Sequence, residues 1–330
     1  MGFLGGSNLS AERLQSDIKK VKALTKKPFG VGLLLPATLA KVALTRSEVR
    51  AELAIKFPKH VEFIRSLMRE HGLDETAVDS EVVTTPEVIE AQLDIVFEEK
   101  IPAFVSGLGD PSRVVQRAGR GAMVVCGLAG SVPNAKRQQK AGVDYVITQG
   151  YEAGGHTGKI ANFALIPQAV DCVKPTPIIA AGGISDGRGI AASLALGAVG
   201  VWIGTAFLVA EECQISPAMK KQIIKSSADD FDITRYNSGK SQRCYQNVIL
   251  QAWKKSGLEP APYPYQQILM SDFNAAASRA NRWDLHANPA GQGAGMLTEI
   301  KPAREIMKDL VEGTIKALSE LNGRADYART

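Results

Sequence analysis

The chain is poor in the residues that build metal centres and disulfide frameworks. It has four cysteines and four histidines among 330 residues. No two cysteines have the short spacing of a zinc site or a dithiol motif, so we predict no metal and reduced thiols. No secretory signal precedes them, and we expect a cytoplasmic protein. The cysteines are Cys126, Cys172, Cys213 and Cys244.

Charge is also sparse and evenly mixed. Charged residues make up 22% of the chain, and the formal net charge is +5. Lysine and arginine are scattered among acidic residues and form no basic stripe with interleaved aromatic residues, so we predict no nucleic-acid binding. A mild excess of positive charge suits a small anionic ligand.

One uncharged run, residues 189–210, is long enough to cross a bilayer. Gly197, Gly200 and Gly204 interrupt it. We therefore interpret the run as a helix, a strand and a turn that a barrel would bury, and we predict no membrane association.

Short apolar segments alternate with helical segments along the first two thirds of the chain. This alternation is typical of βαβ units and a parallel sheet. Ser10 and Thr85, the latter followed by Pro86, are placed to begin two of the helices. Further helices are predicted at 133–141 and 187–196. The strands are predicted at 29–35, 103–106, 122–127, 145–148, 177–181 and 199–203.

Residues 1–4 have the pattern of one further strand, which makes seven where a closed barrel needs eight. We therefore predict an α/β fold, a TIM-type (β/α)8 barrel whose first strand is absent or truncated. It forms a single domain over residues 1–330. A charged, helix-rich insertion at about 45–79 interrupts it, and His60 and His71 in that insertion are predicted to be solvated or structural and not ligands. A covering segment at about 230–330, with helices at 244–255 and 302–321, completes it.

His156 ends a glycine-rich run that directly follows a predicted strand, and the run reads Gln-Gly-Tyr-Glu-Ala-Gly-Gly-His from Gln149. In a barrel, the loops after the strands form the active face. Glycines let the backbone come close to a ligand. An imidazole can remove a proton from carbon or stabilise an anion near neutral pH. The alternative is a histidine that only caps local backbone, and we favour the catalytic interpretation.

Two glycine turns follow the last two predicted strands, one at Gly182 and Gly183 and one at Gly204 and Thr205. Barrels often hold a phosphate at these positions, where backbone N–H groups at the start of a helix are available. The first turn does not have dinucleotide spacing, so a mononucleotide is favoured. A late run, residues 291–295, is predicted to fold over a flat ring, and a plain surface turn is the alternative.

These motifs, in this order, resemble those of the nitronate monooxygenase family, formerly called 2-nitropropane dioxygenases. The resemblance covers nearly the whole chain and implies an FMN-containing TIM barrel. The implied reaction oxidises alkyl nitronates such as propionate 3-nitronate with O2 to a carbonyl compound and nitrite. His156 matches the catalytic histidine of the family. The implied FMN-binding residues are Gln149, Gly154, Gly155, Gly182, Gly183, Trp202, Ile203, Gly204, Thr205, Gly291 and Gln292.

The chain departs from the family pattern at two places on the cofactor site. The family usually begins with a strand that carries a proline and a methionine beside the flavin, and Gly32 stands where an asparagine commonly contacts FMN. Two alternative functions remain open. One is an FMN-dependent NAD(P)H reductase of the enoyl-ACP or quinone reductase type, and the other is a shortened non-catalytic homologue. The predicted partners are a nitronate or nitroalkane and O2, and the oligomeric state stays undetermined.

Overall fold

A curled parallel sheet forms the centre of the protein. The computed structural model describes residues 1–7, 9–35, 45–76, 85–119 and 121–327. Its seven parallel strands follow the order β1-β2-β3-β4-β5-β7-β8, as the sequence predicts. They are β1 (Gly2–Gly5), β2 (Phe29–Leu35), β3 (Ala103–Gly109), β4 (Val124–Ala129), β5 (Tyr145–Gln149), β7 (Ile178–Ala181) and β8 (Gly200–Trp202).

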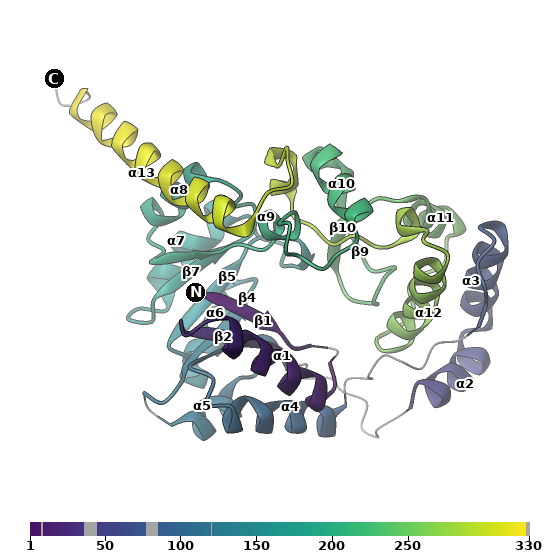
Figure 1. Ribbon diagram of the computed structural model, residues 1–330. Helices are drawn as coiled ribbons and strands as arrows, with labels where there is room; N and C mark the ends of the chain where they lie inside the picture. The colour runs from purple at the N-terminus through teal and green to yellow at the C-terminus, as the bar shows by residue number, and fades with distance from the viewer. Residues whose placement is uncertain (8, 36–44, 77–84, 120, 328–330) are drawn as a thin grey trace.

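Helices cover the outer face of this sheet (Figure 1). Ser10 and Thr85 begin two of them as predicted, because their side chains accept hydrogen bonds from the backbone N–H groups of Arg13 and Val88. Between sheet and helices lies the largest hydrophobic cluster, which includes Leu14. The helices are α1 (Ala11–Leu24), α4 (Pro86–Glu98), α5 (Ser112–Ala118), α6 (Val132–Ala141), α7 (Asn162–Cys172) and α8 (Gly187–Ala195).

The inner face of the sheet encloses a smaller core. Successive side chains of a strand point to opposite faces, so alternate residues of each strand enter the barrel. Val105, Cys126, Ile147 and Ala181 are its buried members. Within the described chain, β1 and β8 are the two edges and no hydrogen-bonded pair joins them. The architecture is therefore the predicted α/β barrel, with an opening between its first and last strands.

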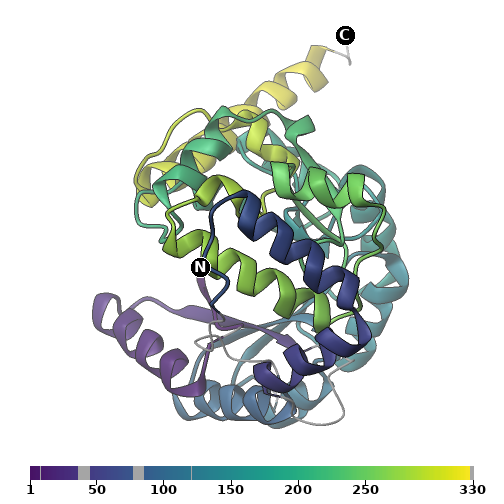
Figure 2. The same cartoon turned by 90° about the vertical axis from the view of Figure 1, so that its right-hand side faces the viewer.

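A second hydrophobic core lies among helices from two distant parts of the sequence. The predicted insertion forms α2 (Arg46–Lys56) and α3 (Pro58–Glu70), which pack with α11 (Val248–Ser256) and α12 (Tyr265–Arg279). Figure 2 shows these helices together in front of the sheet. The insertion and the C-terminal segment thus form one helical layer. An ionic contact of 2.9 Å from Arg46 to Asp272 links α2 to α12.

The C-terminal region differs from its prediction. Cys244 lies in a strand, β10 (Gln242–Tyr245), and the predicted helix begins only at Val248, where the Asn247 side chain caps it. The prediction was wrong because apolar spacing alone does not separate a short strand from a helix start. β10 pairs with β9 (Phe231–Thr234) and with β6 (Gly155–His156) in an antiparallel sheet.

The last helix, α13 (Ala303–Tyr327), runs across α8 and extends beyond it (Figure 1). The two helices are so close that a Cβ atom on Gly187 would lie 2.1 Å from the backbone of Gly313. Among the described residues, no helix combines the length and apolar character needed to span a membrane. The remaining short elements are α9 (Thr205–Leu208), α10 (Pro217–Lys225), η1 (Ala228–Asp230), η2 (Trp283–Leu285) and η3 (Gln292–Met296).

Candidate functional site

His156 lies in a strand and not in the free loop that the sequence predicts. It pairs with Gln242 of β10, and its Nε2 atom is 3.2 Å from the hydroxyl oxygen of Ser238. Burial lowers the pKa of His156, and the positive charge of Lys240 lowers it further. The imidazole is therefore predominantly neutral at neutral pH, which is the form that accepts a proton.

A cleft of about 950 Å³ opens beside His156. The carboxyl ends of β2, β3, β4 and β5 supply one part of its lining, with Leu34, Gly107, Leu128 and Gln149. The β6–β10 side adds His156, Lys240 and Ser241, and the α6 side adds Asn134, Arg137 and Gln138. The predicted residues Gln149 and His156 therefore line the same space.

Three of the predicted glycine segments meet next to this cleft. A Cβ atom on Gly154 would lie 2.5 Å from the carbonyl carbon of Ala290, so only glycine allows this approach. The backbone N–H of Gly291 donates to the hydroxyl of Thr205 at 2.9 Å. The N–H of Gln292 donates to the carbonyl oxygen of Glu152, also at 2.9 Å. The run at 291–295 is thus packed against the His156 loop and is no plain surface turn.

The turn at Gly182 and Gly183 joins the same junction. Both glycines have positive φ, at 100° and 70°, which favours glycine. A Cβ atom on Gly183 would lie 2.9 Å from the Cβ atom of Glu152. Asn162 fixes the turn from α7, because its side-chain amide donates to the carbonyl oxygen of Ala181 at 2.9 Å. Four segments far apart in sequence therefore converge: 150–156, 182–185, 204–205 and 290–293.

Two of these segments present unpaired backbone donors. In the described structure, the N–H groups of Gly183, Ile184 and Ser185 have no backbone or side-chain acceptor, and the same is true of Gly204 and Thr205. The buried hydroxyl of Ser185 also lacks a partner among the described residues. Clustered unpaired N–H groups are the usual binding site of an anion. The two turns are therefore chemically suited to a phosphate group.

The sequence predicts that N–H groups at the start of α8 bind a phosphate, but these groups are already bonded. The Asp186 carboxylate accepts hydrogen bonds from the N–H groups of Arg188 and Gly189, so this helix end already has an anionic cap. The open donors lie one turn earlier in the chain. The prediction was wrong because Asp186, directly before the helix, caps it.

Trp202 and Ile203 contribute side chains elsewhere. Trp202 enters the barrel and packs with Phe3, whereas Ile203 packs in the outer hydrophobic clusters. Neither side chain is among those that line the cleft. Gly155 lies in β6 with φ of 67°, and a Cβ atom added there would have no atom within 4 Å.

Arg243 is a part of the site that sequence reasoning missed. It is 1% exposed, and its guanidinium donates to the carbonyl oxygens of Phe231 and Tyr151, at 2.6 Å and 3.0 Å. The guanidinium also lies 4.5 Å from the centre of the Tyr151 ring. Arg243 therefore holds in place the loop that leads to His156. No sequence spacing reveals this contact, since 92 residues separate Arg243 from Tyr151.

Known proteins match this arrangement along almost its full length. The family described as nitronate monooxygenase matches residues 1–313. The chain belongs to the nitronate monooxygenase family. The resemblance inferred from the glycine motifs is thereby confirmed.

Two relatives illustrate the similarity in sequence. A protein of Mycobacterium tuberculosis assigned as a monooxygenase is 34% identical over 339 residues, which cover 98% of this chain and 90% of the relative. A protein of Staphylococcus aureus (strain Newman) assigned as a nitronate monooxygenase is 30% identical over 322 residues, with coverages of 94% and 86%.

Two solved structures show the same fold. The nitroalkane oxidase of Streptomyces ansochromogenes superposes with a TM-score of 0.81 at 27% identity, over 97% of this chain and 90% of the oxidase. FabK of Thermotoga maritima gives a TM-score of 0.75 at 26% identity, over 98% and 88%. The predicted TIM-type fold is confirmed, and membership of the nitronate monooxygenase family places the chain among the oxidoreductases.

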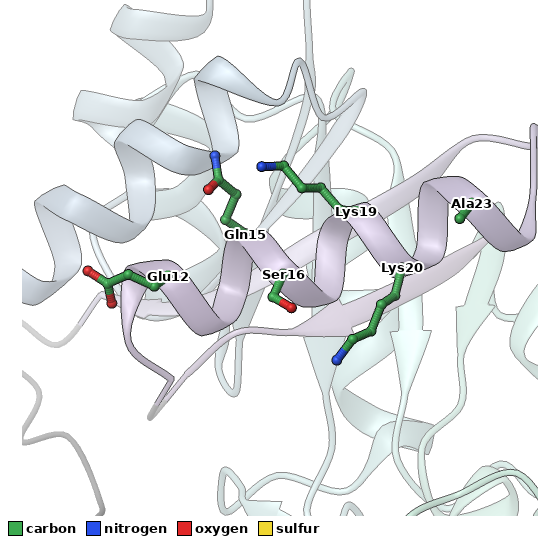
Figure 3. Close-up of a pocket in the computed structure, with 6 residues that line it drawn as sticks. All are labelled: Glu12, Gln15, Ser16, Lys19, Lys20 and Ala23. Atoms are coloured by element: carbon green, nitrogen blue, oxygen red, sulfur yellow. The ribbon is translucent and has the colours of Figure 1, made fainter.

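A second hollow, of about 510 Å³, lies on the outer surface of α1, and none of the residues that line it belongs to the predicted site (Figure 3). Its lining is the polar face of one helix, and Lys20 there pairs with Asp17. The described residues also include no group of three or more metal-ligating side chains. The lining residues are Glu12, Gln15, Ser16, Lys19, Lys20 and Ala23.

Proposed function

We propose that the protein binds FMN and oxidises alkyl nitronates with O2 to carbonyl compounds and nitrite. The observation that carries this proposal is the pair of turns with unpaired N–H groups, at 183–185 and 204–205, beside a cleft that contains a largely neutral histidine. The first feature suits the phosphate of a mononucleotide, and the second suits a carbon acid.

The residues present fit FMN. The two turns would hold the phosphate, with the unpaired hydroxyl of Ser185 as a further donor. Gln149, Gly154, Gly155, Gly182, Gly291 and Gln292 would border the rest of the cofactor, which would extend into the cleft lined by Gln149. When bound, FMN supplies the electron acceptor for the nitronate and the centre that reacts with O2.

The chain itself supplies proton handling and orientation. A neutral nitroalkane must lose a proton from carbon before it becomes a nitronate, and His156 is the base available in the cleft. Ser238 holds the imidazole through the 3.2 Å contact at Nε2. A preformed nitronate needs no base, so His156 would then serve only to orient and stabilise the anion.

An oxygen electrode tests the proposal against the alternative of an FMN-dependent reductase that uses NADH. FMN-loaded protein is mixed with propyl 1-nitronate without NADH. The proposal predicts oxygen uptake and nitrite release. Absence of uptake, together with bleaching of the flavin by NADH, would identify a reductase. Absence of both reactions would identify a non-catalytic homologue.

A further inference from the structure

The last helix, α13, has an anchored half and a projecting half. In the anchored half, Ile306 and Leu310 are buried in one cluster with Ala206 of α9. Gly313 then lies against Gly187 of α8. Beyond this crossing α13 leaves the body of the molecule (Figure 1), and a Cβ atom on Gly323 would have no atom within 4 Å. The projecting half is therefore open to another molecule, and it lies outside the residues that the family matches.

An apolar stripe runs along both halves of α13. Its large apolar side chains are between 43% and 64% exposed. Successive positions are four, three, four and three residues apart, which is the spacing that packs one helix against another over several turns. The stripe consists of Met307, Val311, Thr314, Leu318 and Leu321, with Ile315 at its edge.

The stripe is not the face of α13 that the barrel covers. Ile306 and Leu310 come one residue before Met307 and Val311, and one residue turns an α-helix by about 100°. The barrel therefore holds one side of the helix while the stripe stays exposed on another. A second helix can pack on the stripe without displacing α8 or α9.

The charges of α13 favour a second copy of the chain over a membrane surface. The helix carries four basic and five acidic residues, and no tryptophan or phenylalanine. A helix that lies on a membrane usually has a basic polar face and aromatic residues on its apolar face. Near-neutral charge instead lets two α13 helices approach each other with little repulsion. Charge also alternates in sign every four residues, at Lys308, Glu312, Lys316 and Glu320.

A two-fold axis near residue 316 would cover both halves of the stripe at once. It sets two α13 helices antiparallel, so that the projecting half of each copy lies on the anchored half of the other. Val311 then faces Leu321 of the second copy, and Thr314 faces Leu318. The helix dipoles also oppose each other in this arrangement. Such an interface is self-complementary and closed, as in most homodimers.

The stripe is large enough for an interface of the smaller kind. Its five large side chains expose roughly 450 Å² on one copy, comparable to the largest apolar patch of a typical monomer. Burial on both copies, with the stems of the flanking charged residues, removes about 1,000 Å², the lower bound for a specific interface. An interface of this size is consistent with a dissociation constant in the micromolar range.

We propose that α13 forms an antiparallel two-fold interface between two copies of this chain. The projecting half is then a dimerisation element, and each copy covers the stripe of the other.

Analytical ultracentrifugation over a range of protein concentrations tests the interface. The wild type should change from monomer to dimer in the micromolar range. Leu318→Glu places a carboxylate in the stripe of both copies and should raise the dissociation constant at least about 100-fold. Ser319→Glu adds the same charge one residue later, on the polar face, and should leave the constant within about threefold. Both positions lie on the projecting half, so the melting temperature of the monomer should be unchanged.

Cysteine cross-linking tests the direction of the two helices. The exposed Cys172 is first replaced by serine. A mixture of the Val311→Cys and Leu321→Cys proteins should form a disulfide-linked dimer on mild oxidation, because these positions meet. Val311→Cys alone should not, because the antiparallel arrangement separates the two copies of this position by about 15 Å along the helix.

Four results would overturn the proposal. A wild type that stays monomeric at about 100 µM has no interface of the expected strength. Equal dimerisation of the wild type and Leu318→Glu places the interface elsewhere. Cross-linking of Val311→Cys with itself shows parallel helices. Binding of the monomer to anionic phospholipid vesicles, if Leu318→Glu abolishes it, identifies a membrane surface as the partner of the stripe.

Discussion

Phe3 and Trp202 bridge the opening of the barrel, with ring centroids 4.6 Å apart and ring planes inclined by 49°. They lie on β1 and β8, the two edge strands of the sheet. Gly30 makes room for this contact, because a Cβ atom there would lie 2.1 Å from the Phe3 ring. Seven strands thus bring the edges close enough for side-chain contact without a hydrogen-bonded pair. Since Trp202 lies two residues before Gly204, the contact also supports one wall of the proposed phosphate site.

Removal of the Phe3 ring should destabilise the barrel. Phe3→Ala is expected to lower the free energy of unfolding by about 2 kcal/mol, less than for a fully buried phenylalanine because Phe3 is only partly buried. Chemical denaturation measures this. Phe163, which is 81% exposed on α7, is the control, and Phe163→Ala should change stability by less than about 0.5 kcal/mol. Equal effects of the two substitutions would show that the ring contact contributes nothing.

Gly154 should be essential for the cofactor site. In Gly154→Ala the new methyl group would collide with the backbone of Ala290, so the segment at 290–293 must move away. We expect FMN affinity to fall by at least about tenfold, as measured by fluorescence titration of FMN. Gly200→Ala is the control, because no atom lies within 4 Å of the added carbon. Unchanged FMN affinity in Gly154→Ala would show that this junction is not part of the cofactor site.

Gly32→Asn should strengthen FMN binding. Gly32 lies on the inner face of β2, one step below the cleft residue Leu34, and the nearest atom to an added Cβ is 3.9 Å away. An asparagine therefore fits and adds the amide that the family commonly has at this position. One added hydrogen bond predicts a dissociation constant for FMN that is lower by about fivefold. Gly32→Ala, which adds no amide, should not give this gain, and an equal gain from alanine would refute the explanation.

His156 should control the pH dependence with neutral nitroalkanes. Burial and the positive charge of Lys240 lower its pKa below the ordinary value of about 6.5. The neutral form of His156 therefore predominates from a lower pH than in a free histidine. As pH rises, kcat/KM should increase while His156 loses its proton, with the midpoint of the rise below the ordinary pKa of a histidine. His156→Asn should lower kcat/KM for a neutral nitroalkane by about 10²- to 10⁴-fold and remove this rise.

The preformed nitronate is the control for His156. Because it needs no proton acceptor, His156→Asn should affect its oxidation far less than that of the parent nitroalkane. Equal losses on both substrates, with FMN still bound, would exclude a role for His156 as a base.

The barrel could be predicted because each of its strands and helices is recognisable from a short stretch of sequence. Each strand is a short apolar segment followed by a helix. The glycine turn at 182–183 follows β7 directly, and the turn at 204–205 begins one residue after β8 ends. The inward direction of Trp202 follows from the alternation along β8 and could have been predicted from the sequence as well.

The environment of His156 could not be predicted in this way. β6 has two residues, which is too short for any periodic pattern, and Ser238 is 82 residues away in sequence. The positions of Lys240 and Arg243 depend on the same long-range pairing. Only the folded chain shows which polar residues meet the glycine-rich loop.

The central claim is that the junction of the four glycine segments binds FMN beside His156. The visible absorption spectrum of the purified protein, before and after incubation with FMN and removal of the excess, tests it most directly. We predict a yellow protein with close to one bound FMN per chain. A protein that stays colourless after incubation with FMN would contradict the account.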